Sequence, residues 1–399
     1  MTSSALSTRE ALEPAGALHI AVVTETYPPE VNGVAMTTGR MLNGLMRRGH
    51  RIMLVRPRQS PTEHPQSSWP LSETLVRSIP LPRYAGLRVG LPATASLARL
   101  WLHERPQIVH VVTEGPLGRS ALAAAGRLGI PASSAFHTNF HAYSKHYGFG
   151  LLKPAISAYL RRFHNQAACT FVPTRQLEAQ LAREGYRGLK VVSRGVDTEL
   201  YSPARRSAAL RRHWGAADDD PVVLYIGRLA PEKNMPLVFS TFEQIQLAAP
   251  SARLVLVGDG PQRAELTRRY PQHVFAGMRH GEDLAAHYAS GDLFLFPSVT
   301  ETFGNVTLEA MASGLAVVAY DYAAAREHIV DGHNGMLAAF DDGQAFCRVA
   351  VGLANDDVLR NRLRRAARMT ASQLDWEQVV DNLASALTDL IAPSERAHG

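Results

Sequence analysis

Two glutamates, Glu301 and Glu309, flank a glycine-bearing turn between a predicted strand and a predicted helix, in the spacing E-x7-E. Carboxylates accept hydrogen bonds well from paired sugar hydroxyls, so one of them could hold a hexose and the other a ribose. Between them, the backbone N–H groups around Phe303, Gly304 and Asn305 would open the helix, and a helix N-terminus favours a phosphate. A capped helix with an acidic surface is the alternative interpretation.

Two cations, Arg228 and Lys233, follow the predicted strand Val222–Gly227 and lie five positions apart across a proline-containing turn. Arginine offers a planar fork of donors and lysine a compact point charge, so both side chains could converge on one anion. A pair of solvated charges at the end of a strand would have the same spacing. The pattern by itself leaves both interpretations open.

A third motif, the segment Glu25–Gly33 (ETYPPEVNG), leaves the first predicted strand and enters the first predicted helix. Asn32 and Gly33 permit a close approach of the backbone, and the N–H groups that follow them would suit a phosphate. A turn glycine that only starts the helix explains the pattern as well. Because no G-x-G-x-x-G follows this strand, the sequence disfavours nicotinamide binding.

His137 follows the predicted strand Ala132–Phe136, where an imidazole could donate to a substrate oxygen or act as an acid or base. His141 and His146 lie nearby, but neither has a third ligand at a metal spacing, and we expect His141 to be a loop residue. The D-x-D pattern within Asp218–Asp220 is typical of an exposed connection. With no HExxH motif or Walker loop, we expect no metal site, and the kinase, NTPase and metalloprotease classes are excluded.

The composition describes a globular protein. The 399 residues, 46% of them hydrophobic, suggest about two to three domains. No stretch approaches the roughly 18 uninterrupted apolar residues of a transmembrane helix, and the first 17 residues lack the basic leader and apolar core of a signal peptide. Cys169 and Cys347 are the only cysteines, which fits a reducing compartment. We therefore expect a cytoplasmic protein.

The charge is unevenly distributed. Residues 1–200 carry 23 Lys and Arg against 12 Asp and Glu, and residues 201–399 carry 19 against 24. A basic half could face nucleic acid, an anionic membrane or a phosphorylated small molecule, although scattered arginines also fit a solvated face. The stretches Leu81–Leu91 and Tyr159–Phe163 interleave arginine with tyrosine and leucine or phenylalanine, which suits an anionic bilayer surface. We expect peripheral association with the inner face of the plasma membrane and no nucleic-acid partner; a soluble acceptor pocket is the alternative.

Strand and helix patterns alternate along the chain, which predicts parallel sheets covered by helices on both faces. The apolar period stops at Gly195–Pro203, and a new strand opens after Pro221. We therefore predict an α/β protein of two Rossmann-like doubly wound domains facing across a cleft: residues 1–200, residues 201–375, and a helix within 376–399 that packs back toward the first domain. The predicted strands are His19–Glu25, Arg51–Arg56, Ile108–Val112, Ala132–Phe136, Cys169–Val172, Lys190–Ser193, Val222–Gly227, Arg253–Val257, His273–Phe275, Leu293–Pro297, Ala316–Ala319 and Met336–Ala338.

Five motifs taken together resemble those of the retaining glycosyltransferases of family 4. They are YPPEVNG near the start, the FHT turn, GRL-x3-K, GDGP at Gly258–Pro261 and ETFGNVTLEAMASG. The resemblance runs from about His19 to Ala392, and it is strongest to bacterial mannosyltransferases that use GDP-mannose and to sulfoquinovosyl-diacylglycerol synthases. It implies the glycosyltransferase-B fold.

The resemblance also implies a reaction: metal-independent transfer of a hexose, in the first place mannose from GDP-mannose, from a nucleoside diphosphate sugar to a lipid or glycan acceptor, with retention and without a cofactor. It implies that Arg228 and Lys233 neutralise the donor diphosphate, and that Glu301 binds the transferred sugar. The other roles that it implies are sugar contacts by the backbone of Phe303 and Gly304, a ribose contact by Glu309, loop closure at Gly33, a sugar contact by His137, and base contacts by Met278 and Arg279.

The sequence departs from the family in two turns. Asn32-Gly33 stands where the family commonly has Gly-Gly, and Asp321-Tyr-Ala-Ala-Ala follows the strand Ala316–Ala319 where many members have Gly-Gly. These differences concern the detail of the loops. Two other functions share the same fold: a nucleotide-sugar epimerase and a non-catalytic sugar-nucleotide-binding protein.

Overall fold

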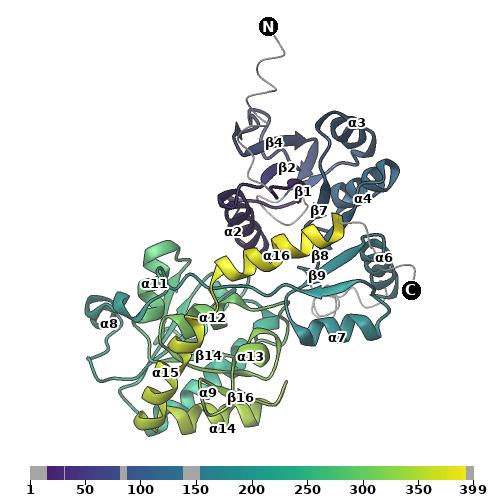
Figure 1. The fold of residues 1–399 in the computed structure, drawn as a ribbon. Helices are drawn as coiled ribbons and strands as arrows, with labels where there is room; N and C mark the ends of the chain where they lie inside the picture. The colour runs from purple at the N-terminus through teal and green to yellow at the C-terminus, as the bar shows by residue number, and fades with distance from the viewer. Residues whose placement is uncertain (1–15, 31, 81–87, 138–152, 392–399) are drawn as a thin grey trace. The chain divides into compact units, whose positions relative to one another are not determined.

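The computed structural model describes residues 16–391 except residue 31 and the segments 81–87 and 138–152, and it divides into two compact units. Among the described residues, the first unit holds 16–137, 153–193 and 376–391, and the second holds 194–375. Each unit is a largely parallel sheet flanked by helices (Figure 1). The predicted α/β class with two Rossmann-like sheets is confirmed.

The sheet of the first unit has eight strands in the order β10-β9-β8-β7-β1-β2-β4-β3, parallel throughout except for the edge pair β3–β4. β1 lies between β2 and β7, so the connections run outward from it in both directions. The inner strands are buried on both faces, which is why they appear in the sequence as short apolar runs. The strands are β1 (His19–Val23), β2 (Arg51–Pro57), β3 (Ser67–Ser68), β4 (Leu71–Val76), β7 (Ile108–Val111), β8 (Ala132–Ala135), β9 (Cys169–Val172) and β10 (Leu189–Val191).

The segment between β2 and β7 contains strands that the sequence did not predict. β4 continues the main sheet beside β2, and β5 (Ser78–Pro80) and β6 (Arg88–Gly90) form a separate antiparallel pair. β4 has the sequence LSETLV and is only partly buried, so it lacks an apolar run. The other strands are two or three residues long, which is too short to produce a periodic pattern.

Two helices far apart in the sequence lie side by side in the first unit: α2 (Gly33–Arg47) and α16 (Trp376–Ile391) (Figure 1). Their apolar faces share one core cluster with β1 and β2. The contact is close, because a Cβ atom at Gly44 would lie 2.5 Å from Val380 Cγ2. Arg47 and Arg48 form exposed ion pairs with Glu377 at 2.7 and 2.9 Å. The other helices of this unit are α3 (Thr94–Glu104), α4 (Pro116–Leu128), α6 (Lys153–His164) and α7 (Arg175–Arg183).

The sheet of the second unit has six parallel strands in the order β13-β12-β11-β14-β15-β16. The strand order reverses between β11 and β14, and in sheets of this kind the crevice beyond that reversal receives ligands. The loops that follow β11 and β14 therefore lie at one edge. The strands are β11 (Val222–Ile226), β12 (Arg253–Val257), β13 (Val274–Gly277), β14 (Leu293–Phe296), β15 (Ala316–Tyr320) and β16 (Met336–Ala338).

The helices of the second unit pack on both faces of this sheet around a large apolar core. The short α8 shows no amphipathic pattern in the sequence, because its six residues AALRRH are largely basic or alanine. The helices are α8 (Ala208–His213), α9 (Met235–Ala248), α10 (Arg263–Arg269), α11 (Gly281–Ala289), α12 (Asn305–Ala312), α13 (Ala323–His328), α14 (Gly343–Ala354) and α15 (Asp357–Ala371).

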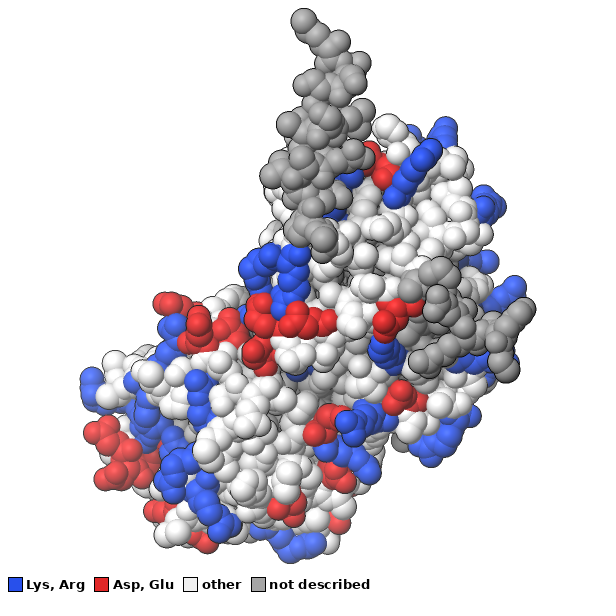
Figure 2. Space-filling view, viewed as in Figure 1, with Lys and Arg blue, Asp and Glu red and all other residues white. Residues whose placement is uncertain are grey.

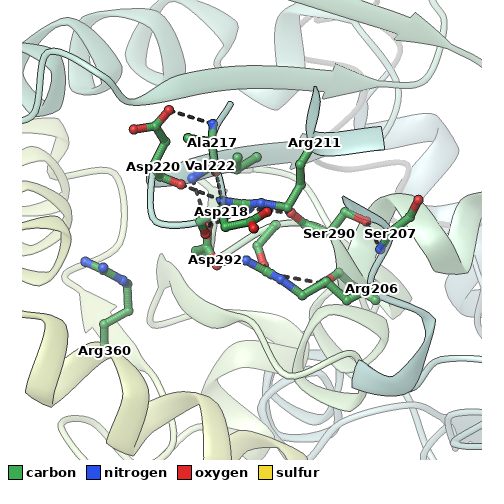
Figure 3. A network of polar contacts seen from close by, with 12 residues as sticks. Arg206, Ser207, Arg211, Ala217, Asp218, Asp220, Val222, Ser290, Asp292 and Arg360 are labelled. Carbon is green, nitrogen blue, oxygen red and sulfur yellow. Dashed lines mark hydrogen bonds and ion pairs between the residues drawn. The ribbon is translucent and has the colours of Figure 1, made fainter. Parts of the chain in front are cut away.

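A buried carboxylate, Asp292, organises the amino ends of β11 and β14 (Figure 3). It pairs with Arg206 at 2.9 Å, Arg211 at 3.0 Å and Arg364 at 3.4 Å, and it accepts the backbone N–H of Val222 at 3.0 Å. Burial opposes its ionisation, but these partners outweigh burial and hold the pKa of Asp292 below its usual value. This network lies at the opposite end of the strands from the loops after β11 and β14.

Candidate active site

Lys233 and Glu301 come together at the carboxyl edge of the second sheet. Lys233 ends a short 3-10 turn after β11, Glu301 follows β14, and the Lys233 ammonium forms an ion pair with the Glu301 carboxylate. Lys233 also lies 3.4 Å from the Ser298 hydroxyl. The two charged side chains are 11% and 15% exposed, so a ligand at this edge can reach them, while water screens them only partly.

The turn between Glu301 and α12 takes its shape from one glycine. Gly304 has φ +91°, in the left-handed region, and directly precedes the first residue of α12, Asn305. Because residue 304 has no side chain, it supplies no cap to the helix. The first backbone N–H groups and the positive end of the helix dipole therefore lie beside Lys233 and Glu301, in a place suited to an anion.

Glu309 lies one helical turn further along α12 and is held by a residue that the sequence analysis missed. The Tyr288 hydroxyl, on α11, donates a hydrogen bond of 2.9 Å to Glu309 Oε2. Tyr288 is fully buried, and burial together with the Glu309 charge raises its pKa well above the usual value. It stays a neutral donor that fixes the carboxylate. In the sequence it looks like any apolar position of an amphipathic helix, and only its pairing with Glu309 identifies it.

Arg228 lies on the same loop as Lys233 and is paired with a buried acid. Arg228 Nη1 is 3.8 Å from Glu232 Oε1, and Glu232 is wholly buried whereas the Arg228 side chain is 45% exposed. The Tyr225 hydroxyl donates to the Arg228 carbonyl oxygen at 3.0 Å and so anchors the backbone. The structure thus brings both predicted cations onto one loop; their convergence on a single anion stays a prediction.

The GDGP motif supports that loop from the neighbouring strand. A Cβ atom at Gly258, which has φ +133°, would lie 2.0 Å from the Gly227 carbonyl oxygen. The Leu229 N–H donates to the Asp259 carbonyl oxygen at 2.9 Å. The two loops therefore pack backbone against backbone, and a side chain at Gly258 would push them apart.

Met278 and Arg279 follow β13 on the same edge. Met278 is 53% exposed. Arg279 donates to the Ala276 carbonyl oxygen at 2.9 Å and pairs with Asp283 at 3.1 Å, so its guanidinium is held near the chain. The exposed thioether beside a fixed guanidinium plane is compatible with a nucleobase, and that role stays a prediction.

Gly33 and His137 belong to the first unit. Gly33 begins α2, and the Asn32 side chain caps this helix by accepting the N–H groups of Val34 and Ala35. A Cβ atom at Gly33 would meet nothing within 4 Å, so the space beside it is open. His137 lines a small, largely apolar pocket with residues of β1, α2 and α16. His141 and His146 lie outside the described residues.

The first unit contains a partly buried acid, Glu25, to which the sequence analysis gave no role. Glu25 accepts the N–H of Gly90 at 2.6 Å and that of Leu117, in the first turn of α4, at 3.1 Å. Burial raises the pKa of Glu25. The N-terminus of α4 is therefore occupied by a carboxylate of the chain itself, at the point where the order of strands reverses between β1 and β7.

The structure corrects the prediction that Tyr159–Phe163 faces a membrane, because two of these residues are buried. Leu160 and Phe163 are 2% and 3% exposed and pack into the core, because they form the inward stripe of α6. Tyr159 donates a 2.7 Å hydrogen bond to the Glu114 carbonyl oxygen.

The other stretch, Leu81–Leu91, lies outside the described residues up to residue 87. Basic and acidic side chains are intermixed on the face in Figure 2.

The described residues contain neither a membrane-spanning helix nor a metal-binding cluster. No helix among residues 16–391, leaving out the three gaps, is both long and apolar enough to cross a bilayer. In the same part of the chain, no group of three or more His, Cys, Asp and Glu side chains is arranged to hold a metal ion.

Family models and curated relatives match most of the chain. The model "Glycosyltransferase Family 4" matches residues 31–200 and "Glycosyl transferases group 1" matches residues 220–356. A GDP-mannose-dependent alpha-mannosyltransferase of Mycobacterium tuberculosis is 34% identical over 92% of this chain and 95% of its own length. Sulfoquinovosyl transferase SQD2 of Arabidopsis thaliana is 31% identical over 75% of this chain and 60% of its own length.

Solved structures show the same fold at low identity. Sucrose-phosphate synthase from Thermosynechococcus elongatus has a TM-score of 0.77 at 18% identity and covers 93% of this chain and 98% of its own. Anabaena HepE in complex with UDP-glucose has a TM-score of 0.71 at 21% identity, over 93% of this chain and all of its own. The predicted two-domain glycosyltransferase-B fold is confirmed.

Proposed function

This chain belongs to glycosyltransferase family 4, and from that premise we propose that it transfers mannose from GDP-mannose to a lipid or glycan acceptor, with retention at the anomeric carbon. The relatives named as GDP-mannose-dependent mannosyltransferases support the choice of donor. The basic balance of residues 1–200 supports an anionic acceptor surface, and we place the protein at the cytoplasmic face of the plasma membrane.

One observation carries the proposal: the ion pair of Lys233 and Glu301 beside the start of α12. A sugar nucleotide presents a diphosphate next to a ring of hydroxyls, and this edge offers a cation and a helix N-terminus next to a carboxylate. Lys233 and the helix N–H groups would bind the diphosphate, while Glu301 would accept hydrogen bonds from sugar hydroxyls. The charges of the site match the charges of such a donor.

The rest of the donor would extend along the same edge. Glu309, with one oxygen held by Tyr288, would accept the ribose hydroxyls. Met278 and Arg279 would contact the base. From the first unit, Gly33 would allow the loop before α2 to close on the diphosphate, and His137 would reach the transferred sugar.

Catalysis in this proposal is electrostatic. As the bond between the anomeric carbon and the phosphate oxygen breaks, positive charge develops on the sugar ring and negative charge on the leaving diphosphate. Arg228, Lys233 and the start of α12 would stabilise that negative charge without a metal ion. The acceptor hydroxyl would attack from the face that the diphosphate leaves and would give its proton to a phosphate oxygen.

The test is a reconstituted reaction. Purified protein is incubated with GDP-mannose or UDP-glucose and with either diacylglycerol-based lipids in vesicles or soluble mannosides, with and without EDTA. We expect release of GDP, an α-linked product by NMR and full activity in EDTA. Conversion of the sugar without release of nucleotide would identify an epimerase, binding without turnover would identify a binding protein, and a β-linked product would overturn retention.

A further inference from the structure

Arg194 is a buried cation in contact with both residues that flank Gly304. It is the first described residue of the second unit along the chain, and only 6% of it is exposed. Its guanidinium lies over the Phe303 ring, 5.4 Å from the centroid, and Nη1 donates to Asn305 Oδ1 at 3.1 Å. One side chain therefore bridges the residue before Gly304 and the first residue of α12.

The surroundings of Arg194 keep it charged and fixed. Burial lowers its pKa to about 10, while the nearby charge of Glu301 acts in the opposite direction, so the guanidinium remains protonated at neutral pH. The Phe303 ring beneath it is 1% exposed and packs edge-on against His328. The Phe303 carbonyl oxygen also accepts the N–H of Ala324 at 2.8 Å. The cation thus rests on a rigid support.

A buried arginine costs free energy unless its surroundings compensate, so its place in the fold needs a reason. The amino ends of the strands already have the arginines that pair with Asp292, and those bind a carboxylate directly. Among the contacts of Arg194 are the face of the Phe303 ring and the side-chain amide of Asn305. Its positive charge is compensated in part by Glu301, the carboxylate that the proposed function assigns to the sugar.

We propose that Arg194 is a positioning residue for the donor diphosphate: it fixes the Phe303–Asn305 turn so that the first N–H groups of α12 face the phosphates, and it places a permanent positive charge behind them. This inference rests on the proposed function, because it assumes that the edge binds a nucleoside diphosphate. Arg194 is not proposed as a catalytic residue, since its guanidinium is buried against the protein.

Binding of the phosphates can be measured separately from binding of the base. If Arg194 acts on the diphosphate, its loss will weaken GDP and UDP, which carry two phosphates, and will leave the affinity for guanosine unchanged. A residue that only stabilised the fold would affect the three probes alike or not at all. Kinetically, the loss will raise KM for the donor more than it lowers kcat, because the turn binds the diphosphate before as well as during transfer.

The experiment measures binding of GDP, UDP and guanosine by calorimetry for wild type, Arg194→Met and Arg194→Lys. We expect Arg194→Met to raise the Kd of GDP by about tenfold, since one charge-assisted contribution is lost. Arg194→Lys keeps the charge but loses the planar fork, and it should recover part of that loss. Arg364→Met is the matched control, because it removes a partly buried arginine of the same unit from the far end of the strands, and it should bind GDP as wild type does.

Each other outcome counts against one proposal or the other. A folded Arg194→Met protein that binds GDP as tightly as wild type overturns the role of Arg194, as does an equal loss of GDP and guanosine binding. Wild-type protein that binds none of GDP, UDP and GDP-mannose overturns the proposed function instead. If Arg194→Met does not fold, Arg194→Lys and Asn305→Ala decide: the inference requires weaker GDP binding in both.

Discussion

Lys233 and Glu301 are 68 positions apart in the chain, yet their side chains form an ion pair in the second unit. The pairing depends on the neighbourhood of β11 and β14, the two strands between which the sheet order reverses. In an unliganded protein each charge compensates the other. A bound donor diphosphate would balance the positive charge of Lys233. The Glu301 carboxylate would then be available to accept hydrogen bonds from sugar hydroxyls.

Glu301→Gln is expected to abolish transfer without unfolding the protein. The amide keeps the size of the side chain. It loses the negative charge that strengthens hydrogen bonds from sugar hydroxyls and that pairs with Lys233. Transfer is measured as GDP release with acceptor present, and folding by circular dichroism. Glu265→Gln, an exposed glutamate of α10, is the control and should be as active as wild type. Turnover of Glu301→Gln near the wild-type rate would remove Glu301 from the site.

Lys233→Met and Arg228→Met are each expected to lower kcat/KM. The expected loss of transition-state stabilisation is about 2–4 kcal/mol, because each change removes a donor to the negative charge that develops on the diphosphate. Lys233 should be the more sensitive, because it is more buried than Arg228 and its charge is less screened. The measurement is steady-state kinetics with GDP-mannose. Unchanged kcat/KM in both variants would place the diphosphate elsewhere.

Tyr288→Phe is expected to raise KM for the donor about three- to tenfold and to change kcat little, because one neutral hydrogen bond that orients Glu309 is lost. Glu309→Gln should have a larger effect on the same constant. Tyr186→Phe, which alters a buried tyrosine of the first unit, is the control. A fall in kcat with unchanged KM would argue that Glu309 does not bind the ribose.

Asp292 predicts a pH dependence of stability. Its pKa in the folded protein lies below its usual value, so it contributes stability that is present above about pH 4, the usual pKa of an aspartate, and is lost as the pH falls through the folded pKa. Asp292→Asn should cost about 3–5 kcal/mol at pH 7, because three arginines lose their shared carboxylate. Urea unfolding at pH 7 and at pH 3–5 measures both effects. A variant as stable as wild type at pH 7 would contradict this account.

The sequence predicted the strands that are buried on both faces, and the strands that it missed, β3 to β6, are short or only partly buried. β1, β9 and β12 are apolar runs because helices cover both sides of a parallel sheet, so their positions follow from composition alone. β4 is a partly buried outer strand and gave no such signal. The prediction of a membrane-facing surface at Tyr159–Phe163 was wrong for Leu160 and Phe163, which are buried. The composition of this helix does not show which of its faces packs inward.

The residues of the candidate site also fall into two groups, those that the sequence marks and those that it does not. Glycines and charges in strand-end loops mark Glu301, Gly304 and Lys233 in the sequence, because special backbone angles and charged groups need particular residue types. Tyr288 and Arg194 are marked by nothing local, since each contacts a partner at least 21 positions away. Only the three-dimensional structure shows which loop an interior side chain supports.

The pairing of α16 with α2 has a consequence for how the first unit is completed. The core of the first unit includes Val380, Leu383 and Leu387, from the last helix that the structure describes. The amino-terminal unit is therefore complete only when α16 is present, whereas residues 194–375 of the second unit form one continuous stretch of the chain. Without α16, the apolar face of α2 lacks its partner helix.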